Sequence, residues 1–456
     1  MLESEQGPET CNTYNMLRLT KMLFETSADS RYMDFYERAL YNHILSTVNP
    51  IQGGFVYFTP MRPGHYRVYS QPQTSFWCCV GSGMENHARY GEMIYSHAGE
   101  EALYVNLFIP SVLNWGKTVI EQKNVFPEEE GTTILVDPKK PSEFDIYIRI
   151  PEWTSGNAAV TVNGNNVEGT MENGYFRISR KWSKGDKIGV SLPMSLRAVP
   201  LPDKSDNYSF MYGPVVLAAE TGRQDQLGMY ADDSRGGHIA YGKQIPLHEM
   251  PVIVGDRNDI LSNISKIEGK PLTFKLTGLA PERYAEMTLV PFSRLHECRY
   301  MVYWEVVSDQ EWKARQEELE RQEVERAALE AATIDKVTCG EQQPESDHFV
   351  EMASSRNGDF NGRHWRTAGK DGWFSYKMKN TSGDAACIMF TFAGNDSADA
   401  VIYVNDIEAG RIAAGSTGKV YIEVPAAVIS EKIMTVMIKP DSKERTPHMF
   451  EVRLMR

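Results

Sequence analysis

One carboxylate and three cysteines in the first 79 residues are the side chains whose types could do chemistry together. Glu9 and Cys11 stand two residues apart, and the adjacent Cys78 and Cys79 follow much later. Three thiols and a carboxylate make a sulfur-rich set of four ligands that suits tetrahedral Zn²⁺. The spacing differs from that of zinc fingers, whose cysteines come as pairs two to four residues apart. The pattern therefore indicates a Zn²⁺ site of a different kind.

The adjacent cysteines have two interpretations. Neighbouring thiols point in divergent directions and are poor disulfide partners, which favours a metal or a reactive role. We expect them at the start of a helix from about Cys79 to His97, where the positive helix end lowers a thiol pKa. Free cysteines are also among the most buried residues, so the pair could be small packing residues. Spacing alone leaves both open, whereas packing is expected for Cys298, Cys339 and Cys387.

Some histidines and aromatic residues are further candidates. His87 falls on the same expected helix and could approach the cysteines, whereas His43 and His97 suit the interfaces between helices. Near the end of the chain, four residues suit either a sugar-binding aromatic face or ordinary core packing: His364, Trp365, Trp373 and Phe374.

Helices are expected to position these residues. Apolar side chains recur at helical spacing over residues 15–24 and again over 33–44. Between these segments, residues 27–30 (SADS) supply turn and N-cap chemistry. Residues 49–77 are rich in proline, glycine and aromatic residues, which predicts a long structured loop, and such loops are usually functional.

After residue 99 the pattern changes to strands. Apolar residues alternate over several short segments separated by turn residues, which predicts a β-sandwich. The expected strands include 102–109, 144–150, 159–162, 175–178, 187–190 and 215–217, with a hairpin turn at Asn163-Gly164. A highly charged helix is expected over 309–331. A second all-β unit follows, with a turn at Asn357-Gly358 and a strand over 401–404.

Composition excludes several classes of protein. The 456 residues are 41% hydrophobic and 24% charged, which is typical of folded chains. A net charge of -13 argues against nucleic acid and against anionic membrane surfaces as partners. No apolar window is long enough for a transmembrane helix. The first residues lack the features of a signal peptide.

Three motifs resemble those of the β-L-arabinofuranosidases, glycoside hydrolase families 127 and 146. The motifs are GPETCNTYNML over 7–17, GGFVYF over 53–58 and FWCCVGSGMEN over 76–86. The resemblance implies a retaining exo-glycosidase on an (α/α)₆ barrel, with a zinc-bound cysteine as nucleophile. By position, Cys78 matches the nucleophile, and Glu9, Cys11 and Cys79 match the other zinc ligands. The implied substrate is a plant-type glycan that contains arabinose, and family analogy implies a periplasmic or secreted enzyme.

The chain also departs from the family. The family's general acid/base glutamate lies upstream of the Glu-x-Cys motif, in a segment that this sequence does not contain. Glu3 and Glu5 sit in no matching motif and are expected on the surface. About three helices precede the strands, fewer than a barrel needs. We therefore expect Met1 to be an internal methionine of a longer enzyme, and this chain alone to be weakly active or inactive.

The predicted fold class is multidomain, α + β. Residues 1–100 are expected to be the C-terminal part of an (α/α)₆ barrel, and 101–308 a β-sandwich region. A charged connecting helix over 309–332 precedes an accessory β domain over 333–456. The alternative function is a non-catalytic carbohydrate-binding or structural β-sandwich protein. A polysaccharide lyase is disfavoured because it needs no thiolate ligands. The sequence does not predict an oligomeric state.

Overall fold

The computed structural model describes residues 2–156, 158–232, 236–360, 363–394 and 397–456. The chain divides into two compact units, with the boundary between Glu320 and Arg321. Each unit contains its own β-sheets and its own hydrophobic clusters.

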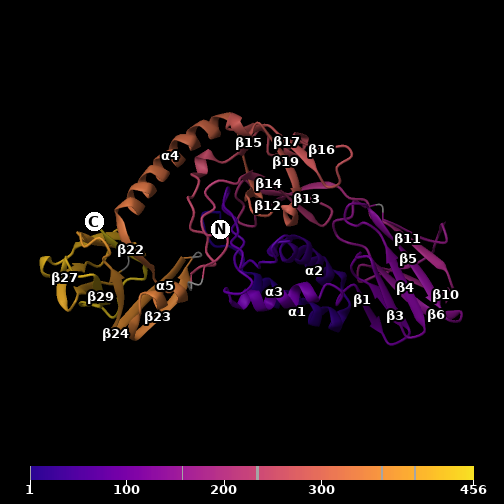
Figure 1. The fold of residues 1–456 in the computed structure, drawn as a ribbon, viewed down its shortest axis with the longest axis horizontal. Coiled ribbons are helices and arrows are strands. Elements are labelled where there is room, and N and C mark those ends of the chain that lie inside the picture. Colours follow the sequence, from indigo (N-terminus) through magenta and orange to yellow (C-terminus); the bar gives the residue numbers. More distant parts are fainter. Residues whose placement is uncertain (1, 157, 233–235, 361–362, 395–396) are drawn as a thin grey trace. The chain divides into compact units, whose positions relative to one another are not determined.

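Three helices stand at the start of the first unit (Figure 1): α1 (Thr10–Ser27), α2 (Ser30–Asn42) and α3 (Cys78–Ala88). The first two confirm the helices predicted from periodicity. Asp29 caps α2, because its carboxylate accepts a hydrogen bond from the backbone N–H of Arg31 at 2.9 Å. A short 3₁₀ helix, η1 (Ile44–Thr47), follows α2. The buried faces of α1 and α2 share one cluster, which includes Leu17, Phe24, Met33 and Leu40.

The predicted extension of the third helix to His97 is wrong. Helix α3 ends at Ala88, and the chain passes Gly91 into strand β1 (Tyr95–Ala98). Strand β1 pairs with β2 (Ala102–Val105), with His97 opposite Leu103. Pairing with a strand that follows closely in the chain thus overrides the helical pattern of this segment. His97 therefore lies in a sheet and not between helices.

Two sheets that follow the helices pack as a β-sandwich. The first has the order β1, β2, β6 (Ser142–Arg149), β10 (Tyr175–Trp182) and β9 (Thr170–Glu172). The second has the order β3 (Ser111–Trp115), β4 (Thr118–Lys123), β5 (Gly131–Pro138), β11 (Asp186–Ser191), β7 (Ala159–Val162) and β8 (Asn165–Asn166). Ile146 and Ile178 from the first sheet share a cluster with Ile134 and Ile188 from the second.

The predicted hairpin at Asn163-Gly164 is confirmed. It joins β7 to β8, and both turn residues have positive φ, at 54° and 82°. The strand predicted over 102–109 is shorter than expected and ends at Val105. Beyond it, the carbonyl of Asn106 accepts a hydrogen bond from Arg149 Nε at 2.6 Å.

A buried ion-pair network ties helix α2 to the sandwich. The Arg149 guanidinium, on β6, donates to Asp34 at 2.6 Å and to Glu37, both on α2. The indole N–H of Trp153 donates to the other carboxylate oxygen of Glu37 at 2.7 Å. Arg149 and Glu37 are fully buried. Each charged group therefore has a partner of opposite charge, as a buried charge requires.

A third sheet completes the first unit. It consists of β12 (Leu196–Pro200), β13 (Asn207–Tyr212), β14 (Val215–Gly222), β15 (Val252–Val254), β16 (Ile264–Lys266), β17 (Phe274–Thr277), β18 (Leu279–Ala280), β19 (Glu286–Pro291), β20 (Arg299–Met301) and β21 (Tyr303–Val307). Its hydrophobic cluster, centred on Phe210, Leu289 and Trp304, is separate from that of the sandwich.

The predicted charged helix is confirmed as α4 (Asp309–Ala332). The boundary between the two units falls within this helix. Most of its described side chains are exposed. Within the described residues, no helix combines the length and the apolar character that crossing a bilayer requires.

The second unit is built around one large sheet. Its strands are β22 (Thr333–Thr338), β23 (Glu351–Phe360), β24 (Arg363–Lys379), β25 (Cys387–Phe392), β26 (Ala400–Val404), β27 (Ile407–Ile412), β28 (Lys419–Glu423), β29 (Ile433–Lys439) and β30 (Met449–Met455). A short helix, α5 (Gln342–Asp347), lies between β22 and β23. Strand β26 confirms the strand predicted over 401–404.

One expectation for the second unit is wrong. Asn357-Gly358 is not a turn, because β23 runs through it and pairs Gly358 with Trp365. A Cβ on Gly358 would lie 2.4 Å from the Trp365 ring, so glycine serves close cross-strand packing here. Two interpretations were left open for His364, Trp365, Trp373 and Phe374, a sugar-binding aromatic face or core packing, and core packing holds for Phe374. Phe374 is fully buried in the core, and neighbouring residues of β24 alternate between its two sides.

Candidate functional site

The start of helix α1 positions Glu9 and Cys11. Glu9 occupies the N-cap position with an extended backbone, and its side chain makes no cap hydrogen bond. The next residue, Thr10, anchors the helix to the loop: its backbone N–H donates to the Tyr57 carbonyl at 3.0 Å, and its hydroxyl donates to the Val56 carbonyl at 2.7 Å. The Glu9 carboxylate is therefore left available to other groups.

The start of helix α3 positions the two adjacent cysteines. Cys78 is the first residue of the helix, as the sequence led us to expect to within one residue. The helix packs tightly on the loop, since a Cβ on Gly83 would lie 2.7 Å from the Phe55 ring. The loop over 49–77 therefore contacts the start of α1 and the middle of α3, and it leads directly into the first residue of α3.

The four predicted side chains meet in one cluster. The ligand atoms of Glu9, Cys11, Cys78 and Cys79 all lie within 4.8 Å of one another. The Cys11 and Cys79 Sγ atoms are 3.1 Å apart, and Glu9 Oε1 lies 3.6 Å from Cys78 Sγ and 3.7 Å from Cys79 Sγ. A tetrahedral Zn²⁺ places sulfur and oxygen ligands about 3.6–3.8 Å from one another. The cluster thus fits a metal ion in ligand type and number; the two distances from Glu9 match this spacing, and the Cys11–Cys79 distance is shorter.

The divergent directions expected of the adjacent thiols are wrong. The Sγ atoms of Cys78 and Cys79 lie 3.9 Å apart and share the same cluster. At the first residues of a helix, rotation about χ1 is enough to turn both thiols to the side from which Glu9 approaches. All six cysteines are free thiols.

Exposure and charge distinguish the three thiols. Cys78 is exposed, Cys11 is half-buried and Cys79 is buried. Burial raises the pKa of Cys11 to about 11 and also raises the pKa of Cys79 well above its usual value. The N-terminal ends of α1 and α3 supply partial positive charge at the cluster. In the metal-free chain the two less exposed thiols therefore keep their protons at neutral pH, and a bound cation would displace them.

Aromatic rings stand beside the exposed thiol. The Tyr57 ring stacks on His238 with centroids 4.2 Å apart, and Trp77 lies edge-on to both, at 6.2 Å from Tyr57 and 5.4 Å from His238. Burial and a hydrogen bond with Cys78 raise the pKa of Tyr57, so its hydroxyl stays protonated. Tyr57, which bonds to Cys78, thus belongs to a group of packed rings of the kind that can contact a sugar.

The other residues considered from the sequence lie outside the cluster. The His87 ring stacks on Phe55, with centroids 5.7 Å apart, and pairs with the Tyr90 hydroxyl. His43 joins two segments as expected, through Thr13 Oγ1 at 2.7 Å and Thr59 Oγ1 at 3.2 Å.

The remaining cysteines and glutamates have ordinary surroundings. Cys298 and Cys339 are buried in hydrophobic clusters, as predicted, while Cys387 is only half-buried. Glu3 is exposed, as predicted, and Glu5 is half-buried.

Sequence reasoning missed three neighbours of the cluster. Ser82 Oγ lies 3.1 Å from Cys11 Sγ, and its position one helical turn after Cys78 was a usable signal. Tyr57 lies within the GGFVYF motif over 53–58, and the motif alone gives it no role. His238 reaches the site from a distant part of the chain, and no local pattern marks it.

Family models match successive segments of the chain. Residues 2–92 match the β-L-arabinofuranosidase GH127 catalytic domain, and residues 102–194 match the GH127 middle domain. Both GH127 matches thus fall within the first 194 residues. Residues 197–306 match a domain of unknown function, DUF4986, and residues 328–455 match a family of unknown function, DUF6805. All four cluster residues fall within the GH127 catalytic match.

A curated β-L-arabinofuranosidase and solved GH127 structures are similar to part of the chain. A non-reducing end β-L-arabinofuranosidase of Bifidobacterium longum subsp. longum is 23% identical over 231 residues, which are 46% of this chain and 35% of that protein. The solved structure of a GH127 β-arabinofuranosidase covers 66% of this chain and 49% of its own, at 23% identity and a TM-score of 0.50.

A GH127 β-L-arabinofuranosidase from Geobacillus stearothermophilus T6 covers 66% of this chain and 50% of its own, at 20% identity and a TM-score of 0.49. The chain therefore spans about half or less of the length of these GH127 relatives.

Proposed function

We propose that the cluster of Glu9, Cys11, Cys78 and Cys79 is the active centre of a retaining glycosidase of the β-L-arabinofuranosidase type. The observation that carries this proposal is the convergence of four ligand atoms within 4.8 Å around one exposed thiol. The GH127 match over residues 2–92 supports the same chemistry. The proposed substrate is a plant-type glycan that bears arabinofuranose.

In this proposal all four side chains hold a zinc ion. When bound, Zn²⁺ would supply the positive charge that keeps the thiols ionised near neutral pH. The donor set itself favours zinc over magnesium or calcium, because thiolates are soft ligands and those two ions select oxygen. The Glu9 carboxylate and the buried position of Cys79 limit the movement of the ligand atoms in the cluster.

Cys78 is the proposed nucleophile because it is the exposed thiol of the set. Its sulfur attacks the anomeric carbon, the bond from that carbon to the leaving oxygen breaks, and a thioglycosyl intermediate forms on Cys78. Water then attacks the same carbon, the carbon–sulfur bond breaks and returns the Cys78 thiolate, and the sugar leaves with its configuration retained. The Tyr57 hydroxyl, which bonds to Cys78, orients the sulfur for this attack.

The retaining scheme also needs a carboxyl group that protonates the leaving oxygen and later activates water. We place this acid/base outside the present 456 residues, and we place helices α1 to α3 in an (α/α)₆ barrel to which further helices contribute. It follows from this placement that the chain alone hydrolyses ordinary substrates weakly or not at all.

An activated substrate tests the nucleophile without the missing acid. A dinitrophenyl β-L-arabinofuranoside has a leaving group that departs without a proton, so Cys78 can react with it unaided. Hydrolysis of the intermediate still needs a base, so the adduct should accumulate. After zinc loading, intact-protein and peptide mass spectrometry should find one anhydropentose on the peptide that carries Cys78.

A matched pair of variants completes this test. Cys78→Ser should take up no pentose, whereas Cys387→Ser, which replaces a half-buried cysteine of the second unit, should be labelled like the parent. Labelling that persists in Cys78→Ser, or no labelling of a zinc-loaded chain, would contradict the assignment of the nucleophile.

A further inference from the structure

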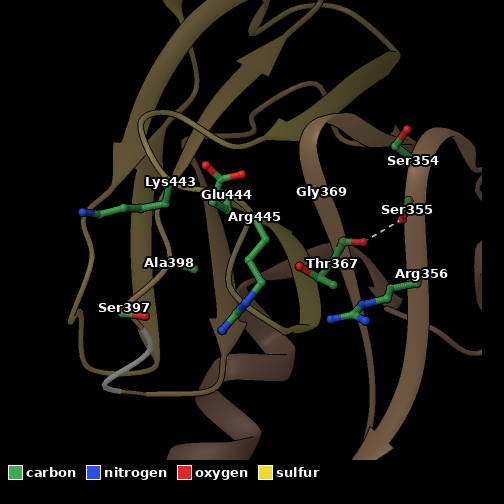
Figure 2. Close-up of a pocket in the computed structure, with 10 residues that line it drawn as sticks. All are labelled: Ser354, Ser355, Arg356, Thr367, Gly369, Ser397, Ala398, Lys443, Glu444 and Arg445. Carbon is green, nitrogen blue, oxygen red and sulfur yellow. Dashed lines mark hydrogen bonds between the residues drawn. The ribbon is translucent and has the colours of Figure 1, made fainter.

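The pocket between the strand ends of the second unit does not bring its cationic groups to one point (Figure 2). It has a volume of about 590 Å³, and Arg356 and Arg445 both line it. The Arg445 guanidinium is directed toward Ser397 and not toward Arg356. Side chains from distant parts of the chain do converge in the first unit, beside the cysteine cluster.

The segment that reaches the cluster lies between β14 and β15 of the third sheet. We call its described residues, 224–232 and 236–245, the arm. The arm falls within residues 197–306, which match a domain of unknown function. It contacts the loop over 49–77, which carries Tyr57 and leads into Cys78. The contacts between the arm and the loop therefore connect this domain to the candidate site.

One buried guanidinium fastens both ends of the arm to the loop. Arg299, on β20, is fully buried. It donates to the carbonyls of Gln224 and Asp225 at 2.8 and 2.6 Å, at the first end of the arm. It also donates to the Lys243 carbonyl at the other end and to the Gly64 carbonyl in the loop, both at 2.8 Å. Because four carbonyl oxygens surround this buried charge, separating the arm from the loop would leave it unsatisfied.

The Tyr66 hydroxyl makes a second connection. It accepts a hydrogen bond from the Gly242 N–H at 2.8 Å and donates to the Leu227 carbonyl at 2.5 Å. A Cβ on Gly242 would lie 2.4 Å from the Tyr66 hydroxyl oxygen, so this close approach requires glycine. One residue of the loop thus bonds to both sides of the arm.

Backbone pairing extends the contact between the arm and the loop. The Tyr69 N–H donates to the Met229 carbonyl at 2.8 Å, and the Ala231 N–H donates to the Tyr69 carbonyl at 2.9 Å. The Gln71 side-chain amide donates to the Ala231 carbonyl at 2.7 Å. Met229 and Ala231 also share a hydrophobic cluster with Trp77. The arm is therefore ordered against the loop, and a side chain that it carries has a defined position.

His238 is the side chain that the arm brings to the site. It is buried, and its ring stacks on the Tyr57 ring with centroids 4.2 Å apart and planes at 30°. Trp77 lies edge-on to both rings, with centroids 5.4 Å from His238 and 6.2 Å from Tyr57. The Tyr57 hydroxyl bonds to Cys78. His238 and Trp77 together limit the rotation of the Tyr57 ring, and so the position of its hydroxyl beside the thiol.

We propose that the arm completes the active centre and that His238 is a positioning residue. The His238 ring holds the Tyr57 ring at the angle from which the Tyr57 hydroxyl bonds to the Cys78 sulfur. This role of His238 rests on the proposed function, in which the Cys78 sulfur is the nucleophile. It gives residues 197–306 a part in catalysis that is exerted through His238, although the arm itself provides no group that reacts.

Alkylation of Cys78 by iodoacetamide tests this role without any glycosidase activity. Peptide mass spectrometry follows the reaction at the exposed Cys78 in the zinc-free chain at neutral pH. His238→Ala and Tyr57→Phe should each slow it about tenfold, which is the scale of one hydrogen bond to a charged sulfur. Because both changes remove the same hydrogen bond, the double variant should be no slower than Tyr57→Phe alone.

Two further variants separate the ring of His238 from its polarity. His238→Phe keeps a ring and should restore most of the parent's rate, whereas His238→Asn is polar without a ring and should react as slowly as His238→Ala. Because His238 is buried, this pair also decides the question if the alanine variant does not fold. His97→Ala, which replaces an exposed histidine of β1, is the matched control and should react like the parent.

Pentose uptake from the dinitrophenyl β-L-arabinofuranoside tests the link to catalysis. In the zinc-loaded chain, His238→Ala should lower the maximal rate of uptake by Cys78 about tenfold, while the zinc content stays at about one per chain. A parent chain that takes up no pentose would contradict the proposed function, whereas the alkylation rates would still decide the role of His238.

Four results of the alkylation experiment would overturn the proposal. They are reaction of His238→Ala at the parent's rate, reaction of His238→Phe as slow as that of His238→Ala, an unchanged rate in Tyr57→Phe, and a double variant slowed by the product of the two single effects. The last result would show that His238 and Tyr57 act independently.

Discussion

Two polar clusters in the first unit differ in how their charges are balanced. In the network of Arg149, Asp34 and Glu37, a guanidinium lies between two carboxylates, and a tryptophan N–H satisfies a further oxygen. In the cluster of Glu9 with Cys11, Cys78 and Cys79, every ionisable group becomes negative when it ionises, and no described side chain supplies a positive partner among the four. One of its members, Cys78, is exposed.

This difference separates a structural cluster from one that is suited to a ligand. A buried network with complementary charges holds elements together and needs nothing further. A group of three thiols and a carboxylate within 4.8 Å offers four ligand atoms and contains no cationic member, so a bound cation would supply the missing positive charge. Clustering of polar residues alone would have given the two regions the same interpretation.

The largest expected difference is in the free energy of unfolding, when one glutamate in each cluster is replaced by glutamine. Glu37→Gln should lower the free energy of unfolding by about 3–5 kcal/mol, because it leaves part of a buried charge network uncompensated. Glu9→Gln in the metal-free chain should change it by less than about 0.5 kcal/mol, because the contacts of this carboxylate with the Cys78 and Cys79 thiols are long, at 3.6 and 3.7 Å. Urea unfolding followed by tryptophan fluorescence measures both.

The control for this pair is Glu85→Gln on the exposed face of α3, which should also cost less than about 0.5 kcal/mol. Equal destabilisation by Glu37→Gln and Glu9→Gln would remove the distinction between the two clusters.

The second-largest expected effect is an increase in the free energy of unfolding when zinc is added. At free Zn²⁺ a hundredfold above the dissociation constant, binding to the folded state should raise the free energy of unfolding by about 2.7 kcal/mol. Chelation should reverse the gain, and Glu9→Gln should reduce it. The Glu37→Gln variant should start from a lower free energy of unfolding, and zinc should raise that free energy by the same amount as in the parent. This result would show that zinc acts at the cysteine cluster and not at the ion-pair network.

A smaller effect concerns His43, which joins α2 to the loop. Burial and the nearby Arg67 lower its pKa to about 4, whereas an unfolded histidine titrates near about 6.5. The unfolded state therefore takes up a proton first as pH falls. The stability that neutral His43 contributes is present above about pH 6.5 and is lost between there and about pH 4. His43→Gln should flatten this acid loss, measured by urea unfolding from pH 7 to 4.

His348 in the second unit should behave in the opposite way. Burial lowers its pKa, but hydrogen bonds with Asp335 and the Pro344 carbonyl outweigh burial and raise it overall. Its contribution is therefore present at low pH and is lost as pH rises through the folded pKa. His348→Gln should make the acid loss steeper, and flattening by both substitutions would contradict these directions.

Local features of the fold were predictable because neighbouring residues determine them. Apolar spacing located α1 and α2, Asp29 capped α2, and Asn163-Gly164 formed its hairpin. Where a long-range contact competes with a local pattern, the sequence misleads. The segment up to His97 pairs with β2 and so leaves the helix, and Gly358 serves the packing of Trp365 and not a turn.

The candidate site was predictable only in part. The types of Glu9, Cys11, Cys78 and Cys79 pointed to a metal, and the structure brings them together. Their common direction depends on how the loop over 49–77 joins two helix starts, which no periodicity encodes. His238 reaches Tyr57 across a long stretch of chain, and Arg149 reaches α2 in the same way.

Zinc content of the purified chain tests the central claim most directly. Elemental analysis after zinc loading and removal of unbound ions should find about one zinc per chain, held by the four ligands of one tetrahedral site. Cys79→Ser should lose that zinc, and Cys387→Ser should keep it. A chain without zinc, or a zinc content unchanged by Cys79→Ser, would contradict the account.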